Sequence, residues 1–226
     1  MAADEKRAAG RKVRNIDGRR IVFDREDFFD DPDDWTISAV AFTGHKALLG
    51  PTGIGGLVTA PEVEIVSSRF GGTGIDSQDP GQPQSFPYRL ESGTLNLLGI
   101  VGLNAGLDYL KKMGMVENHR LKMALLSRFR KELSEIDRVE VYGSLSHDRH
   151  VPVLSFNITG FHPGDAGMIL DGDYDIAVRS GLHCAPLVHK DIGCAPYGAI
   201  RISLGWNTTQ PDMDRVLAAV LEMAGL

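Results

Sequence analysis

Residues 41–56 have the sequence AFTGHKALLGPTGIGG, and an apolar run over residues 37–42 leads into them. The run predicts a strand, and the small residues after it predict a turn that presents the side chains of Thr43, His45 and Lys46 together. A lysine at the end of a buried strand is desolvated, which favours the neutral amine that forms a Schiff base. The segment therefore predicts a strand that delivers a reactive amine to a binding site. The alternative is a solvated surface pair.

Length and composition are those of a globular protein with a sizeable core: 226 residues, of which 42% are hydrophobic and 24% charged. The formal net charge of −6 argues against a general nucleic-acid binder, although residues 6–20 hold a basic cluster that predicts a solvated arm. The apolar stretch at residues 97–107 is interrupted by glycines and is too short to span a bilayer. Because the charged N-terminus has no apolar signal region, we expect a cytoplasmic protein without nucleic-acid or membrane partners.

Cysteine usage excludes a disulfide framework. The chain has 2 cysteines, Cys184 and Cys194, and no Cys-x-x-Cys pair. In a large chain expected in the cytoplasm, this number predicts neither structural disulfides nor a zinc site.

Hydrophobic periodicity predicts alternating strands and helices. Strands are predicted at residues 21–23, 37–42, 55–59, 139–142, 151–157, 176–179 and 199–203. Helices are predicted at residues 94–112, 116–133, 164–170 and 211–223. Thr94 is the expected N-cap of the first helix, and Thr208 or Thr209 that of the last. Alternation of strands and helices over residues 115–226 predicts a small α/β domain.

A second candidate site lies in residues 179–186, RSGLHCAP, and in the apolar strand segment GAIRISLG at residues 198–205. A cysteine beside a histidine and close to an arginine has surroundings that make a thiolate available. A buried, inert thiol at Cys184 is the alternative. Arg201, inside an apolar strand, requires a carboxylate, either from a structural acid or from a substrate.

Five motifs resemble, in order, those of class V aminotransferase-fold enzymes, closest to the cysteine desulfurase and selenocysteine lyase branch. The motifs are TGHK followed by GPTGIG, then GGTG, ESGTLN, RSGLHCAP and RISLGWNT. The resemblance covers about residues 35–226. It implies an α/β fold, the pyridoxal-phosphate-dependent transferase fold type I. Residues 1–34 match poorly, and residues 113–226 resemble the small C-terminal α/β domain. Residues 35–112 resemble part of the large cofactor-binding domain with its connecting helix, and a mixed, mainly parallel sheet is expected at residues 20–90.

The resemblance implies a pyridoxal 5'-phosphate site around the first motif. Lys46 would form the internal aldimine with the cofactor and move the Cα proton of the substrate. Thr43 and His45 would contact the cofactor phosphate, and Thr73 would reach the phosphate of a neighbouring subunit's cofactor. The family is dimeric, so a homodimer is expected.

The resemblance also implies a sulfur-transfer site around the second motif. Arg201 would clamp the carboxylate of the amino-acid substrate, with Arg179 at the edge of the pocket. Cys184 would be the nucleophile that takes sulfur from L-cysteine, leaving a persulfide and alanine. A sulfur-acceptor protein is the expected next partner.

This chain departs from the family in its first residues. Family members place a longer N-terminal half before the lysine, with an aspartate that holds the pyridinium nitrogen. Asp24 lies in roughly that place, but Arg25 and Glu26 follow it instead of the family's Ala-Gln pair. Besides the desulfurase-like enzyme, a non-catalytic binding or dimerisation module and one half of a split enzyme completed by another chain stay open. A transaminase or lyase without a cysteine nucleophile is disfavoured by Cys184.

Overall fold

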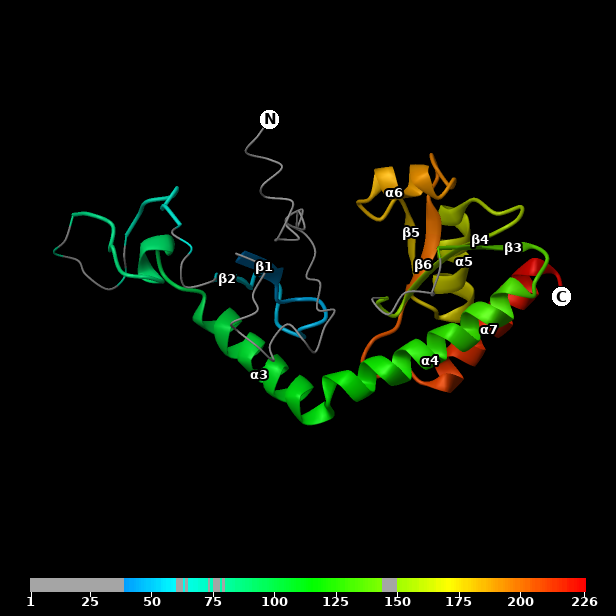
Figure 1. The fold of residues 1–226 in the computed structure, drawn as a ribbon. Coiled ribbons are helices and arrows are strands. Elements are labelled where there is room, and N and C mark those ends of the chain that lie inside the picture. Colours follow the sequence, from blue (N-terminus) through cyan, green and yellow to red (C-terminus); the bar gives the residue numbers. More distant parts are fainter. Residues whose placement is uncertain are drawn as a thin grey trace, which may run out of the picture. The chain divides into compact units, whose positions relative to one another are not determined.

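The computed structural model describes residues 39–59, 63, 65–72, 74, 78, 80–143 and 150–226. These residues divide into two compact units, an N-terminal unit that ends at Met113 and a C-terminal unit from Gly114 to Leu226 (Figure 1). Each unit is described by itself below. The predicted strand at residues 21–23 and the candidate Asp24 lie outside the described residues.

Strands β1 (Ala39–Thr43) and β2 (Gly55–Thr59) form an antiparallel pair in the N-terminal unit. β2 has the predicted bounds, and the described part of the predicted strand 37–42 lies within β1. This is the only strand pair among the described residues of this unit, and the expected mixed, mainly parallel sheet allows an antiparallel pair. The connection over residues 44–54 is too short for a parallel crossover, which requires about a dozen residues or more, usually folded as a helix.

Helix α3 (Leu97–Met113) follows a short 3-10 turn, η2 (Tyr88–Leu90). The helix begins three residues later than predicted, because Asn96 and not Thr94 caps it: the Asn96 side-chain oxygen accepts the N–H of Gly99 at 3.0 Å. Gly106 brings the helix against the loop after β1. A Cβ there would lie 2.5 Å from the Leu48 carbonyl oxygen, so only glycine allows this approach.

The C-terminal unit contains a four-stranded antiparallel sheet with the order β3-β4-β6-β5. The strands are β3 (Val139–Tyr142), β4 (Val153–Ile158), β5 (Arg179–Gly181) and β6 (Ala199–Ser203). The helices are α4 (Met115–Ser134), α5 (Pro163–Tyr174), α6 (Pro186–Asp191) and α7 (Gln210–Ala224). β3 and β6 have the predicted bounds, whereas β5 begins three residues later than the strand predicted at 176–179. Helix α6 was not predicted, because six residues are too few to show the spacing of apolar residues that indicates a helix.

The core of the C-terminal unit lies between one face of the sheet and helices α4, α5 and α7. In α4, Leu126, Phe129 and Leu133 are buried at the helical spacing, and in β4 the buried residues alternate with half-buried ones. Ile200 and Ile202 of β6 belong to the same core, so by alternation Arg201 points to the opposite face. The sheet therefore keeps one face for packing and one for polar groups.

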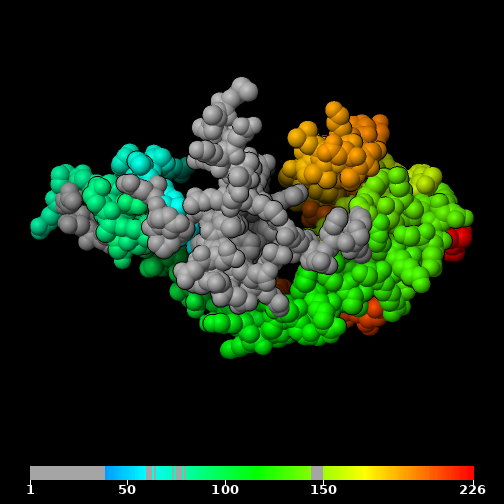
Figure 2. Space-filling model, in the orientation of Figure 1, coloured from blue at the N-terminus to red at the C-terminus, as the bar shows by residue number. Residues whose placement is uncertain are grey.

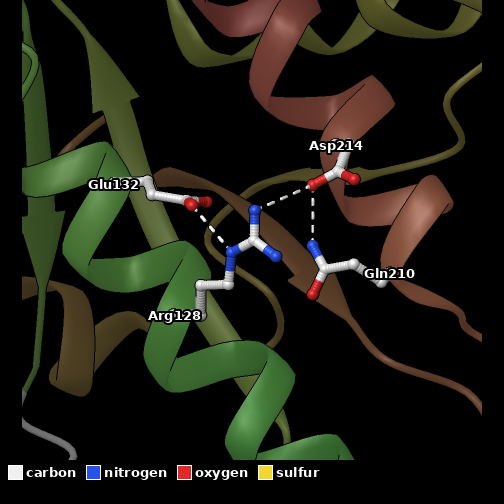
Figure 3. Close-up of polar contacts among 4 residues, drawn as sticks. All are labelled: Arg128, Glu132, Gln210 and Asp214. Atoms are coloured by element: carbon white, nitrogen blue, oxygen red, sulfur yellow. Dashed lines mark hydrogen bonds and ion pairs between the residues drawn. The ribbon is translucent and has the colours of Figure 1, made fainter.

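Polar contacts tie α4 to α7 at the surface (Figure 3). Arg128 donates to Glu132 at 2.8 Å within α4 and to Asp214 of α7 at 3.5 Å, and Gln210 also donates to Asp214. Exposed pairs of this kind contribute little to stability, because water screens them. The predicted cap of the last helix is confirmed: Thr209 forms a capping box with Asp212. None of the helices in the described ranges combines the length and the apolar character needed to cross a bilayer.

Candidate functional site

The turn that was predicted to present the Lys46 amine directly follows β1. The hydroxyl oxygen of Thr43 lies 2.9 Å from Nδ1 of His45, and Gly44 donates its N–H to the Ile54 carbonyl oxygen at 2.8 Å. Gly44 is necessary here, because a Cβ would lie 2.7 Å from Cγ2 of Ile54. The turn thus brings hydroxyl, imidazole and amine within one short segment.

The expectation that Lys46 is desolvated at the end of a buried strand is wrong. The described residues of β1 are half-buried or exposed, and Lys46 itself is exposed. The reason is that β1 has a single neighbour, β2, among the described strands, so its edges and faces are not covered as in a central strand.

Cys184, the candidate nucleophile, lies in a turn between β5 and α6. Cys184 is exposed, and Nη2 of Arg179 donates to its sulfur at 3.3 Å. His183 and Cys184 have φ angles of 53° and 60°, in the left-handed region that non-glycine residues rarely adopt. The turn closes with a hydrogen bond from the Ala185 N–H to the Leu182 carbonyl oxygen at 2.8 Å. The guanidinium thus contacts the sulfur within the turn that carries it.

Two arginines share the polar face of the sheet beside this thiol. Arg179 of β5 is the direct cross-strand partner of Arg201 of β6, so both side chains leave the same face. Burial, with a smaller contribution from repulsion by Arg179, lowers the pKa of Arg201. Nε of Arg201 is buried and has no hydrogen-bond partner. A buried N–H group of a cationic side chain that lacks a hydrogen-bond partner is suited to bind an anion, such as the carboxylate of a bound amino acid.

Sequence reasoning missed a buried pair below the thiol turn, His189 and Cys194. His189 is 3% exposed and lies between Cys194, whose sulfur is 2.9 Å from its Nδ1, and His183, whose Nδ1 is 3.2 Å from its Nε2. The only signal in the sequence was a histidine and a cysteine that flank a glycine turn, which by itself predicts no contact.

The structure brings the sequence-predicted residues together in two groups. Thr43, His45 and Lys46 share one turn of the N-terminal unit, and a separate group in the C-terminal unit contains Cys184, Arg179 and Arg201. Thr73 lies outside the described residues.

A comparison with protein families gives the class of this fold. The family described as Aminotransferase class-V matches residues 30–216. Because this match spans most of the sequence, the chain belongs to the class-V aminotransferase family, and its fold is the pyridoxal-phosphate-dependent transferase fold type I. Both agree with the resemblance of the five motifs.

Relatives and solved structures place the chain beside cysteine desulfurases. It is 34% identical over 193 residues to a "Probable cysteine desulfurase" from Methanothermobacter thermautotrophicus, covering 82% of this chain and 47% of the relative. It is 32% identical over 187 residues to a "Cysteine desulfurase" from Cronobacter sakazakii, covering 80% of this chain and 44% of the relative. The chain therefore spans about half the length of the curated relatives it matches.

Solved structures give the same result. An apo cysteine desulfurase from Thermococcus onnurineus is similar with a TM-score of 0.70 and 34% identity, over 84% of this chain and 48% of that one. The cysteine desulfurase CsdA from Escherichia coli is similar with a TM-score of 0.70 and 30% identity, over 83% of this chain and 47% of that one. Fold and motifs thus agree on the same branch of the family.

The residues present fit part of a pyridoxal-phosphate site, the cofactor of this family. The Lys46 amine suits the aldehyde of the cofactor, and the Thr43 hydroxyl and His45 imidazole suit its phosphate. In the C-terminal unit, the unpartnered Nε of Arg201 suits a carboxylate. Asp24, the candidate partner of the pyridinium nitrogen, lies outside the described residues.

Proposed function

We propose that this chain carries the lysine, the sulfur nucleophile and the carboxylate-binding arginine of a cysteine desulfurase that acts on L-cysteine. The observation that carries the proposal is the contact of Cys184 with Arg179 on the sheet face that also bears the unpartnered Nε of Arg201. It combines a nucleophile and an anion site, the two groups that sulfur abstraction from an amino acid requires. The membership of this chain in the class-V aminotransferase family supports the choice of reaction.

Lys46 has two roles in this proposal. Its amine would hold the cofactor aldehyde, and Nζ would accept and return the proton of the substrate Cα. The exposed position of Lys46 leaves Nζ open to both groups. When bound, pyridoxal phosphate supplies an electron sink for the bonds at the substrate Cα. Thr43 and His45 orient the phosphate, and their mutual contact limits the freedom of both side chains.

Cys184 performs the sulfur transfer. Its thiolate attacks the sulfur of the substrate, so a new S–S bond forms while the substrate Cβ–S bond breaks. The products are a Cys184 persulfide and alanine. The proton that leaves the Cα of L-cysteine returns to Cα, and the proton that the Cys184 thiol releases goes to Cβ. Arg201 holds the carboxylate, and Arg179 holds the attacking sulfur. The persulfide then passes its sulfur to an acceptor, which we propose is a second protein.

The first test is the visible absorption spectrum after pyridoxal phosphate is added. We expect a band that Lys46→Ala abolishes and that changes when L-cysteine is added. Lys111→Ala, which removes an exposed lysine of α3, is the matched control and should keep the band. Release of alanine by the wild type but not by Cys184→Ser is the second expected result. A band that is equal in Lys46→Ala and wild type would refute the proposal.

A second candidate is a subunit that shares its cofactor site with another polypeptide. The exposed apolar side chains of α3 favour it: Leu97, Leu98 and Val101 are 63%, 86% and 67% exposed. The test is coexpression with the N-terminal half of a cysteine desulfurase. A Lys46-dependent band only in the coexpressed sample indicates a shared site, whereas a band from the chain alone excludes the need for one. A homodimer is distinguished from both by the measured mass in solution.

A further inference from the structure

Three side chains below the Cys184 turn form a continuous hydrogen-bonded chain. It runs from the sulfur of Cys194 to Nδ1 of His189 at 2.9 Å, and from Nε2 of His189 to Nδ1 of His183 at 3.2 Å. It ends where Nε2 of His183 lies 3.0 Å from the carbonyl oxygen of Arg179. The chain thus connects a buried thiol to the residue next to Cys184.

The direction of each hydrogen bond follows from the last acceptor. The carbonyl oxygen of Arg179 only accepts, so Nε2 of neutral His183 must carry its proton. Nδ1 of His183 is then an acceptor, and Nε2–H of His189 donates to it. Nδ1 of His189 is left as an acceptor, and the S–H of Cys194 donates to it. One set of tautomers therefore satisfies all three contacts without a charge.

The surroundings support the neutral form of this chain. Burial is the largest cause that lowers the pKa of His183, and the nearby groups of Arg201, His189 and Arg179 lower it further. The hydrogen bond to the Arg179 carbonyl oxygen raises it in part. Burial also raises the pKa of Cys194, so its thiol keeps the proton that it donates. A cationic His183 would donate from both ring nitrogens, so His189 would need the Nδ1–H tautomer and the Cys194 sulfur would accept in place of donating.

The backbone fixes the lower end of the chain. The carbonyl oxygen of His189 accepts the N–H groups of both Cys194, at 3.0 Å, and Ala195, at 3.1 Å. His189 is 3% exposed and Cys194 is 8% exposed, so water does not compete for these groups. α6 lies at the surface of its unit (orange in Figure 2), and these two bonds are among those that join the helix to the loop that follows it.

The upper end of the chain reaches the thiol by two routes. His183 precedes Cys184 directly, and both residues adopt the left-handed conformation. His183 also binds the main chain of Arg179, the residue whose guanidinium holds the Cys184 sulfur at 3.3 Å. Rotation of the His183 ring would therefore disturb both the turn and the strand that position the sulfur.

We propose that His189 and Cys194 are positioning residues for Cys184: the S–H of Cys194 and the ring of His189 fix the tautomer and orientation of His183, which holds the thiol turn against Arg179. The inference rests on the proposed role of Cys184 as the nucleophile. It adds a function for the second cysteine, which contributes a hydrogen-bond donor and not a second reactive sulfur.

The test is the rate at which iodoacetamide alkylates Cys184, followed by mass spectrometry of the peptide that contains it. Cys194→Ala removes the donor, and Cys194→Ser, of similar volume, keeps one. We expect alkylation of Cys184 to be about two- to tenfold slower in Cys194→Ala, the value of one ordinary hydrogen bond, and close to wild type in Cys194→Ser. His189→Leu should slow it at least as much, and His189→Gln should restore part of the rate. Equal rates in the alanine, serine and wild-type proteins would overturn the proposal.

A second measurement uses the unaltered protein, so it does not depend on a variant that folds. Nitrogen chemical shifts of the ¹⁵N-labelled imidazoles should show His183 and His189 both protonated on Nε2 and not on Nδ1. A proton on Nδ1 of His189 would reverse the direction of the chain and overturn the proposal. Neither measurement needs cofactor or substrate. Absence of desulfurase activity, with the expected alkylation rates and tautomers, would therefore refute the proposed function alone.

Discussion

The two units differ in how much apolar surface they bury. Every residue of the hydrophobic core cluster belongs to the C-terminal unit, and Phe129, Phe156 and Leu133 in it are fully buried. In the described part of the N-terminal unit, only Leu48 and Leu110 among the hydrophobic side chains are buried.

The candidate groups differ in the same way. The thiol of Cys184 is supported by a strand arginine and by a buried chain of hydrogen bonds, whereas the exposed amine of Lys46 follows a turn with one side-chain contact. Packing density and precision of positioning go together, because a side chain keeps one geometry only where its neighbours are fixed. The difference teaches that the surroundings of the Cys184 thiol are built by the C-terminal unit itself, whereas the described residues around Lys46 leave most of its surroundings open.

The largest expected effect is that of a cavity in the C-terminal core. Phe129→Ala should lower the free energy of unfolding by about 3–5 kcal/mol, since a fully buried ring leaves a void that the sheet and helices cannot close. Leu98→Ala, at a side chain that is 86% exposed on α3, should change it by less than about 0.5 kcal/mol. Urea denaturation followed by circular dichroism measures both. Similar losses in the two variants would break the comparison between the units.

The next effect concerns the backbone beside the thiol turn. Gly198 has a φ of +80°, and a Cβ there would lie 2.1 Å from the Gly181 carbonyl oxygen. Gly198→Ala should therefore lower the free energy of unfolding by about 2–4 kcal/mol. Gly172→Ala is the matched control, because its Cβ would meet nothing within 4 Å in helix α5. It should stabilise the protein by up to about 1 kcal/mol in the same denaturation experiment. A Gly198→Ala protein as stable as wild type would contradict the close approach.

A smaller effect is expected at the packing contact of the N-terminal unit. In Gly106→Ala the new Cβ would lie 2.5 Å from the Leu48 carbonyl oxygen, so the loop after β1 must move from α3. We expect a loss of about 1–2 kcal/mol, less than at Gly198, because the loosely packed unit adjusts more easily. Hydrogen exchange of the Gly50 amide, which donates to the Gly44 carbonyl oxygen, reports the change locally. Asn104→Ala, at an exposed position of the same helix, should leave that exchange unchanged.

The smallest effect is a dependence of stability on pH in the C-terminal unit. The pKa of His183 is lowered in the folded state by burial, so below about pH 6.5, the ordinary histidine pKa, the unfolded chain binds a proton that the fold excludes. Stability should be complete above that pH and fall as the pH decreases through the window between the ordinary and the lowered pKa. His183→Gln should make the plot of melting temperature against pH shallower there. Parallel plots for variant and wild type would show that His183 does not titrate in this way.

Patterns in the sequence predicted the parts of the fold that depend on near neighbours. β2, β3 and β6 have their predicted bounds, since alternation and turn residues act over a few positions. The motifs also gave the family, which the match over residues 30–216 confirms. The thiol beside an arginine followed from the spacing of Arg179 and Cys184 along one strand and turn.

Contacts between distant positions were decided only by the tertiary structure. The exposure of Lys46 depends on which strands neighbour β1. The link from Cys194 through His189 to His183 depends on how the chain folds back after α6. A local pattern of apolar residues predicts neither of them. The sequence alone determined which chemical groups this protein carries, because motifs are local. Only the tertiary structure decided which of them are buried, held and paired, because burial and hydrogen bonding depend on residues that meet in space.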